Sequence, residues 1–190
     1  MSYVNYFSAA VLAGGLSTRM GQDKASLIFG KSTLLNHQIE KLRLLGIDDL
    51  MISGWREPLP DTRLIPDEIP HRGPLGGIHA CLNAAKYDAV LFLSVDVPLV
   101  PPEALRALLD AHSGGATVLT VGAKREPLIA VYDRSVLPDA EALLRSDQRA
   151  VRLLLDRVSV QEVPFAGDPT LLNNCNTPAE YAEALKKGLL

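Results

Sequence analysis

The sequence is poor in cysteine and has no long apolar run. Its 190 residues include only two cysteines, Cys81 and Cys175. Because two cysteines far apart in the chain supply neither a disulfide framework nor a zinc cluster, we expect a reducing compartment. No apolar run approaches the ~20 residues that cross a bilayer, and the first residues lack the basic segment of a secretory signal. These absences predict a cytoplasmic protein with no membrane partner.

An excess of positive charge is also missing. The formal net charge is −3, so no global field attracts nucleic acid, and an anionic substrate must be held by local charges. Repeats, low-complexity segments and linkers are absent as well. With 47% hydrophobic residues, the chain is long enough for one well-cored domain and short for two. We therefore expect a single domain over residues 1–190, acting as a monomer without nucleic acid.

A glycine-rich loop carries the densest set of candidate ligand-binding residues. The apolar run 10–13 is typical of a strand buried on both faces of a parallel sheet. Gly14 and Gly15 follow it and allow backbone N–H groups to approach phosphate oxygens closely. Arg19 adds a planar guanidinium group that can donate two parallel hydrogen bonds, and Lys24 adds an ammonium group on a flexible side chain. This combination fits a triphosphate, at the carboxyl end of a strand, where open α/β sheets bind ligands.

The loop matches neither of two standard phosphate-binding motifs. No window supplies the G-x-G-x-x-G dinucleotide fingerprint. The segment ASLIFGKS ends like a Walker A motif but has Ala25 in place of the first glycine, so we interpret Gly30–Ser32 as a turn and a helix start. Taken alone, a glycine pair after a strand could be only a tight turn beside solvated basic residues.

Strands alternate with helices along the rest of the chain. We expect strands over residues 50–53, 63–66, 89–95, 117–121, 128–132 and 158–163. Helices are expected over 33–45, from a glycine-rich loop at 73–77 to about 86, from 101 to 113, and over 138–145, 149–155 and 178–187. A polar turn is expected at 124–126. This alternation argues for a three-layer α/β/α fold with a mostly parallel sheet.

The run LAGGLSTRMGQDK, residues 12–24, resembles the L-A-G-G-x-S-x-R-M-G-x-D-K signature of the MobA-type nucleotidyltransferases, the molybdenum cofactor guanylyltransferases. The resemblance covers roughly residues 9–181. It implies a Rossmann-like nucleotidyltransferase architecture of the glycosyltransferase-A type. It also implies transfer of GMP from GTP to the phosphate of molybdopterin, with release of pyrophosphate. The loop residues that it implies for catalysis or nucleotide binding are Leu12, Ala13, Gly14, Gly15, Arg19 and Lys24.

Asp96 directly follows the clearest strand of the sequence. A lone aspartate there could simply cap a turn. It could instead hold Mg²⁺, which takes hard oxygen ligands and often only one or two carboxylates besides substrate phosphates. In the family that the sequence resembles, an Asp-x-Pro after a hydrophobic strand binds magnesium, and residues 94–98, SVDVP, match that place. The resemblance therefore implies Asp96 as a catalytic residue and metal ligand.

Four more places in the sequence match the family. An aspartate shortly before G-P-L-x-G helps place the nucleotide in related enzymes, which implies nucleotide-binding roles for Asp67 and Gly77. The N-x-N-T-P sequence at 174–178 implies that Asn174 and Asn176 face the metal and the acceptor, although such a run is ordinarily a helix cap with Thr177 as N-cap. Residues 126–128 and Arg149 resemble segments that line the acceptor side.

Ser53 departs from the family pattern. Guanylyltransferases present an asparagine near the guanine edge at this place, and a serine hydroxyl would leave base choice more to backbone groups. A cytidylyltransferase, or a nucleotidyltransferase of the same fold with another phosphate acceptor, is the alternative. The alternative of a different class is a non-catalytic nucleotide-binding regulatory module, which would not need a metal at the α-phosphate. The implied partners are GTP, molybdopterin, and other molybdenum cofactor biosynthesis proteins and apo-molybdoenzymes.

Overall fold

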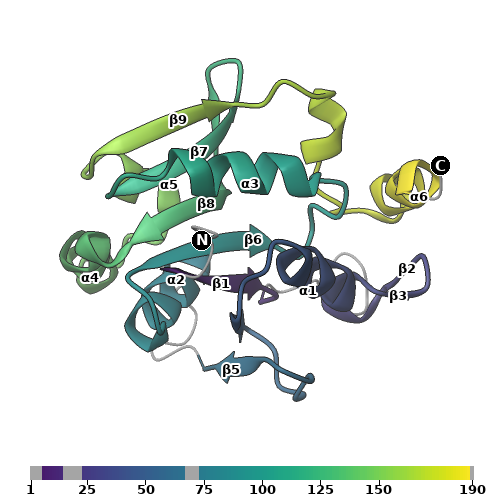
Figure 1. The fold of residues 1–190 in the computed structure, drawn as a ribbon, viewed down its shortest axis with the longest axis horizontal. Helices are drawn as coiled ribbons and strands as arrows, with labels where there is room; N and C mark the ends of the chain where they lie inside the picture. Colours follow the sequence, from purple (N-terminus) through teal and green to yellow (C-terminus); the bar gives the residue numbers. More distant parts are fainter. Residues whose placement is uncertain (1–5, 15–22, 67–72, 189–190) are drawn as a thin grey trace.

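A computed structural model describes residues 6–14, 23–66 and 73–188 of the chain. A seven-stranded sheet forms its middle layer, in the order β5–β4–β1–β6–β8–β7–β9 (Figure 1). The strands are β1 (Phe7–Leu12), β4 (Asp49–Ser53), β5 (Arg63–Ile65), β6 (Ala89–Ser94), β7 (Ala116–Val121), β8 (Lys124–Asp133) and β9 (Val160–Pro164). Among these strands only β8 runs antiparallel to its neighbours. The predicted mostly parallel sheet is therefore confirmed.

Helices cover both faces of the sheet, as predicted. One face packs against α1 (Leu34–Leu44) and α3 (Pro102–Ala111), and the other against α2 (Gly73–Ala84), α4 (Leu137–Arg145) and α5 (Val151–Leu155). The C-terminal helix α6 (Pro178–Gly188) lies beyond the carboxyl ends of β1 and β6 (Figure 1). No helix in the described part of the chain has the length and apolar composition that a membrane span requires.

Strand β1 explains the layering. Ala9 and Val11 belong to the apolar cluster under α1 and α3, whereas Ala10 and Leu12 belong to the cluster under α2. Successive side chains of a strand point to opposite faces, so an uninterrupted apolar run is buried on both. β1 pairs in parallel with β4 on one side and β6 on the other. The apolar run 10–13 was correctly interpreted as a doubly buried strand.

Two predicted loops are part of regular elements. Residues 73–77 belong to α2 rather than to a loop that precedes it, because Leu75 and Ile78 bury one face of the helix while Gly77 lets it approach β1 and β4. Residues 124–126 belong to β8 rather than to a turn. The turn lies at residues 122–123, where Gly122 has φ +57°, and a register shift between Val118 and Leu119 accommodates Pro127 opposite β7.

The loops after β1 and β4 touch through their backbones. Gly54 has φ +77°, and a Cβ added to it would lie 2.3 Å from Gly14 Cα and 2.4 Å from Gly14 N. The Ala13 N–H also donates to the Ser53 carbonyl oxygen at 2.9 Å. Glycine is therefore required at position 54, whereas a Cβ on Gly14 would be tight, 3.1 Å from Gly54 Cα.

We expect Gly54→Ala to lower the free energy of unfolding by about 3 kcal/mol or more, because a left-handed conformation and a backbone clash add together. Gly30→Ala is the matched control: Gly30 also has a positive φ, +64°, but an added Cβ meets nothing within 4 Å. That control should lose only about 1 kcal/mol in urea unfolding. Equal losses in the two variants would contradict the clash.

Candidate active site

Three side chains from distant segments meet at the carboxyl ends of β1 and β6. The Lys24 ammonium donates to Asn176 Oδ1 at 2.5 Å and lies 3.6 Å from Asp96 Oδ2. The exposed fractions of the Lys24 and Asp96 side chains are 15% and 18%. These are three of the residues that the sequence predicted for one site. Lys24 is thus mostly buried among oxygen atoms rather than solvated on a loop.

A short 3₁₀ helix, η2 (Lys24–Ser26), positions Lys24. Asp23 caps it by accepting the Ala25 N–H at 3.1 Å, and the Leu27 N–H closes the turn on the Lys24 carbonyl oxygen at 3.1 Å. Ala25 is fully buried and anchors the turn in the core. The Lys24 side chain therefore leaves from a fixed backbone.

Asp96 is oriented by Ser94 at the end of β6 and by the segment before α6. Ser94 Oγ donates to Asp96 Oδ1 at 2.6 Å, which leaves Oδ2 toward Lys24. The Cys175 N–H donates to the Asp96 carbonyl oxygen at 2.8 Å and so ties the segment before α6 to this loop. Ser94 is an orienting residue that the sequence pattern did not single out, although it stands two positions before Asp96.

A capping box fixes Asn176 at the start of α6. Thr177 Oγ1 accepts the Glu180 N–H at 3.3 Å, and Glu180 Oε2 accepts the N–H groups of Asn176 at 2.8 Å and Thr177 at 2.9 Å. Because these N–H groups donate to it, the pKa of the Glu180 carboxyl is lowered. The predicted cap at Thr177 is confirmed, and it coexists with the contact of Asn176 to Lys24. Tyr181 also donates its hydroxyl to the Ile28 carbonyl oxygen in the hairpin of β2 (Ile28–Phe29) and β3 (Ser32–Thr33).

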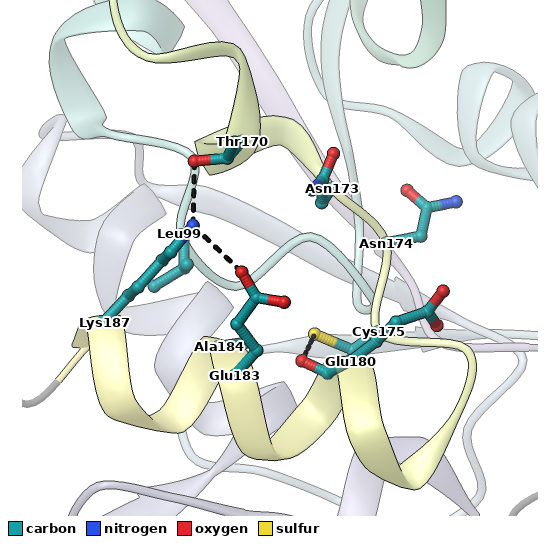
Figure 2. A pocket seen from close by; sticks show the side chains of 9 residues that line it. All are labelled: Leu99, Thr170, Asn173, Asn174, Cys175, Glu180, Glu183, Ala184 and Lys187. Atoms are coloured by element: carbon teal, nitrogen blue, oxygen red, sulfur yellow. Dashed lines mark hydrogen bonds and ion pairs between the residues drawn. The ribbon is translucent and has the colours of Figure 1, made fainter.

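The segment before α6 also borders a small pocket against η4 (Pro169–Leu172), drawn in Figure 2. Lys187, which lines this pocket, donates to Thr170 Oγ1 at 2.9 Å and forms an ion pair with Glu183 at 3.2 Å. The side chain of Asn174 points away from α6 (Figure 2). Burial raises the pKa of the Cys175 thiol to about 11, so this cysteine is a protonated packing residue and not a nucleophile.

The nucleotide side of the predicted site is built from the ends of β1, β4 and α2. Leu12 and Ala13 are 5% and 4% exposed, whereas Gly14 is exposed. A Cβ on Gly77 would lie 2.5 Å from Ser53 Oγ and 3.2 Å from Leu12 Cδ2. Because the Ala13 N–H is already bonded to Ser53, Gly14 is the member of this group that can face a ligand.

Other predicted site residues are not joined to this cluster. Arg149 forms an ion pair with Asp147 at 3.0 Å between α4 and α5, and none of its described contacts reaches Lys24, Asp96 or Asn176. Gly15, Arg19 and Asp67 lie outside the described residues. Their proposed roles remain predictions.

The cluster fits a hard cation. Within the described ranges, no group of three or more His, Cys, Asp or Glu side chains could hold a metal by itself. Mg²⁺ does not require one, because it commonly takes one or two carboxylates and completes its shell with water and substrate phosphates. Here the Lys24 ammonium already lies between Asp96 Oδ2 and Asn176 Oδ1. These oxygens therefore form an environment that accepts positive charge.

Helix α1 holds the Asp96 loop from the inside of the protein. Gln38 Nε2 donates to the carbonyl oxygens of Ser94 at 2.9 Å and Val97 at 3.1 Å. Lys41 donates its ammonium to the Pro98 carbonyl oxygen, which also lies 3.0 Å from His37 Nε2. The sequence interpretation missed these residues. A signal was present, because Gln38 stands four positions from both Leu34 and Leu42 on the apolar face.

Comparisons with known proteins place the chain in a family. The family model described as MobA-like NTP transferase domain matches residues 9–162. The chain belongs to this family. A molybdenum cofactor guanylyltransferase from Vibrio cholerae is 33% identical over 183 residues, which cover 93% of this chain and 90% of that protein.

Solved structures agree with the MobA-like fold. Molybdopterin-guanine dinucleotide biosynthesis protein A from Archaeoglobus fulgidus superposes with a TM-score of 0.80 at 23% identity, covering 95% of this chain and 97% of the other. A 2-C-methyl-D-erythritol 4-phosphate cytidylyltransferase from Thermus thermophilus superposes with a TM-score of 0.72 at 16% identity, over 95% and 98% of the two chains. The predicted nucleotidyltransferase architecture is therefore confirmed, and this MobA-like protein is a nucleotidyltransferase.

The buried Lys41 makes stability depend on pH. Burial lowers the pKa of its ammonium to about 7, while the unfolded chain keeps the ordinary value of 10.5. Between these values the unfolded state binds the proton and the folded state does not, so the free energy of unfolding rises with pH. Below about pH 7 both states are protonated, and the folded state bears the full cost.

We expect the free energy of unfolding to rise by about 1–2 kcal/mol from pH 7 to about pH 8.5 because of Lys41. Lys41→Met should remove that rise, whereas Arg43→Met, which deletes a partly exposed cation from the same helix, should keep it. Urea unfolding at both pH values measures the difference. A rise that persists in Lys41→Met would contradict this assignment.

Proposed function

We propose that the protein transfers GMP from GTP to the phosphate of molybdopterin and releases pyrophosphate. The observation that carries the proposal is the convergence of Lys24, Asp96 and Asn176 at the carboxyl ends of β1 and β6. The curated guanylyltransferase relative, aligned over 93% of this chain, supports the choice of substrates. We further propose that the enzyme acts as a cytoplasmic monomer and passes its product to molybdoenzymes or other cofactor biosynthesis proteins.

The reaction needs alignment and charge neutralisation more than a protein nucleophile. An oxygen of the molybdopterin phosphate attacks the α-phosphorus of GTP, and the bond from that phosphorus to the α,β-bridging oxygen breaks. Pyrophosphate leaves with the electron pair of that bond. Because both reactants are anions, fixed positive charge and backbone N–H groups must hold them together. The attacking phosphate is already anionic, so no general base is required.

Lys24 is the described cation that can serve the phosphates. Its ammonium is held by Asp96 and Asn176 and can turn from them to a phosphate oxygen as its rotatable bonds allow. Arg19 and the N–H groups of Gly14 and Gly15 would add donors on the same loop. Asp67, Gly77, Leu12, Ala13 and Ser53 would place the nucleoside, and Asn174, Asn176 and Arg149 would face the acceptor.

We propose Mg²⁺ as the cofactor, held by Asp96 together with substrate phosphates. When bound, the metal supplies positive charge against the charge that develops on the transferred phosphate and on pyrophosphate. Ser94 keeps one carboxylate oxygen of Asp96 occupied and the other directed at Lys24. The Asn176 amide oxygen is a further hard ligand within the same cluster.

Cytidylyl transfer is the second candidate, and Ser53 is the observation that favours it. Ser53 is 4% exposed and its hydroxyl packs against Gly77, so it offers less to a base edge than an asparagine side chain would. The shared fold with a cytidylyltransferase leaves the base choice to such local contacts. A binding module without turnover is less favoured, because the relatives are named as transferases.

We expect the dinucleotide of guanine, not of cytosine, when enzyme, Mg²⁺ and molybdopterin are incubated with GTP and CTP in competition. Ser53→Ala should reduce the preference for GTP by about two- to twelvefold, the worth of one neutral hydrogen bond. Mass spectrometry of the products gives the ratio. Preference of the wild type for CTP would replace the guanylyl proposal with the cytidylyl one.

Lys24→Ala should lower kcat by about a hundredfold or more, since the variant loses a positive charge at the reacting phosphates. Lys31→Ala removes an exposed lysine seven positions along the chain and should leave kcat unchanged. Both variants should keep the circular dichroism spectrum of the wild type. A loss in Lys24→Ala smaller than about tenfold would remove Lys24 from the phosphate site.

A further inference from the structure

The inner face of α1 carries two polar residues that stability does not explain. Gln38 is fully buried and Lys41 is 7% exposed, on a face otherwise formed by Leu34, Leu35, Ile39 and Leu42. Among the residues that the structure describes, none bonds to the buried Gln38 Oε1, and an unpaired buried acceptor is destabilising. Burial also disfavours the charge of Lys41. A methionine at either position would fill a similar volume without these costs, although it would no longer donate a hydrogen bond to the loop that Gln38 and Lys41 contact.

Both residues reach the same five-residue segment, 94–98. The strand β6 ends at Ser94, so the carbonyl oxygens that follow have no strand partner. Gln38 binds the carbonyls of Ser94 and Val97, one on each side of Asp96. Its amide has a fixed orientation, because the flipped amide would place Oε1 against two carbonyl oxygens. The Lys41 ammonium donates to the carbonyl oxygen of Pro98, and His37 Nε2 lies 3.0 Å from the same oxygen.

A further carbonyl contact comes from the other side of the loop. The Cys175 N–H donates to the Asp96 carbonyl oxygen, and the Val95 N–H donates to Leu12 in β1. The loop is therefore held between α1, β1 and the segment before α6. Only the Asp96 side chain remains directed at the Lys24 cluster, with Ser94 orienting it.

We propose that Gln38 and Lys41 are positioning residues for Asp96: they hold its loop from α1 so that the carboxylate is pre-oriented toward the cation site. The inference rests on the proposed function, because it concerns the metal-binding step of that reaction. Partners that orient a metal ligand typically contribute about 10- to 100-fold to metal affinity. On this proposal, the polar residues buried on the inner face of α1 are there because they orient the site and not because they stabilise the fold.

The test uses Mn²⁺ as the probe for the Mg²⁺ site, in the presence of α,β-methylene-GTP, which the enzyme cannot turn over. Electron paramagnetic resonance of free Mn²⁺ gives the dissociation constant for wild type, Gln38→Met, Lys41→Met and Lys41→Arg. Arg43→Met is the control, since it removes a cation from the outer face of the same helix. Urea unfolding of each variant at pH 7 gives its stability.

We expect Gln38→Met and Lys41→Met to raise the dissociation constant for Mn²⁺ by about tenfold or more. Their free energies of unfolding should stay close to that of the wild type, because the polar cost that each substitution removes offsets the cost of leaving the bonded carbonyl oxygens without this donor. Lys41→Arg keeps a cationic donor and should bind Mn²⁺ within about threefold of the wild type, as should Arg43→Met. A loss of metal affinity without a matching loss of stability distinguishes positioning from a structural role.

Two results would overturn the inference while leaving the proposed function intact: Mn²⁺ binding by Gln38→Met and Lys41→Met within about threefold of the wild type, or a loss of affinity that appears only together with a loss of stability. A wild-type protein that binds no Mn²⁺ with the nucleotide analogue would overturn the proposed metal site, and this inference with it. Asp96→Asn removes the carboxylate itself, so its dissociation constant for Mn²⁺ is the reference for a site without the proposed metal ligand.

Discussion

β1 lies in the middle of the sheet with apolar side chains on both of its faces, and this constraint fixes where chemistry can occur. With β4 and β6 paired on its two sides, all three strands end at the same edge. An unpaired polar group is costly along a buried strand, so polar groups that face a ligand are expected in the turns beyond Leu12, Ser53 and Ser94. The contact between Gly14 and Gly54 then sets how closely two of these turns approach.

The periodic elements of the fold could be predicted because their apolar patterns are strong. α1 carries its apolar residues at helical spacing, ends near Gly46, and is capped by Thr33 through the Asn36 N–H. The strand at 89–95 is a continuous apolar run. Prediction failed where a glycine fits either a loop or a regular element. Residues 73–77 are predicted as a loop, but they belong to α2, where Gly77 allows the helix to pack closely against β1 and β4. The turn before β8 is predicted two residues too late.

The candidate site was predictable only in part. Lys24 stands out in the glycine-rich loop after an apolar run, and the family resemblance implied site roles for Asp96 and Asn176. The structure brings the three side chains together. The supporting residues stand out less. A polar Gln38 on the apolar face of α1 is a sequence signal that this position is unusual. The partners of Gln38 and Lys41, however, are backbone carbonyl oxygens of residues 94–98, which residue types do not reveal. Ser94 and the Glu180 cap act through similarly local geometry.

The Lys24 cluster links the two halves of the proposed reaction. One ammonium contacts the carboxylate expected to hold the metal and the amide expected to face the acceptor, so a ligand that draws Lys24 away changes both. Binding of a triphosphate would take a cation from Asp96 and leave its charge for Mg²⁺, which makes metal and nucleotide mutually favourable. Asn176 would be freed at the same moment. The rigid supports from α1 and the α6 cap confine that change to side chains, because the backbones carrying Asp96 and Asn176 are already bound on their other sides.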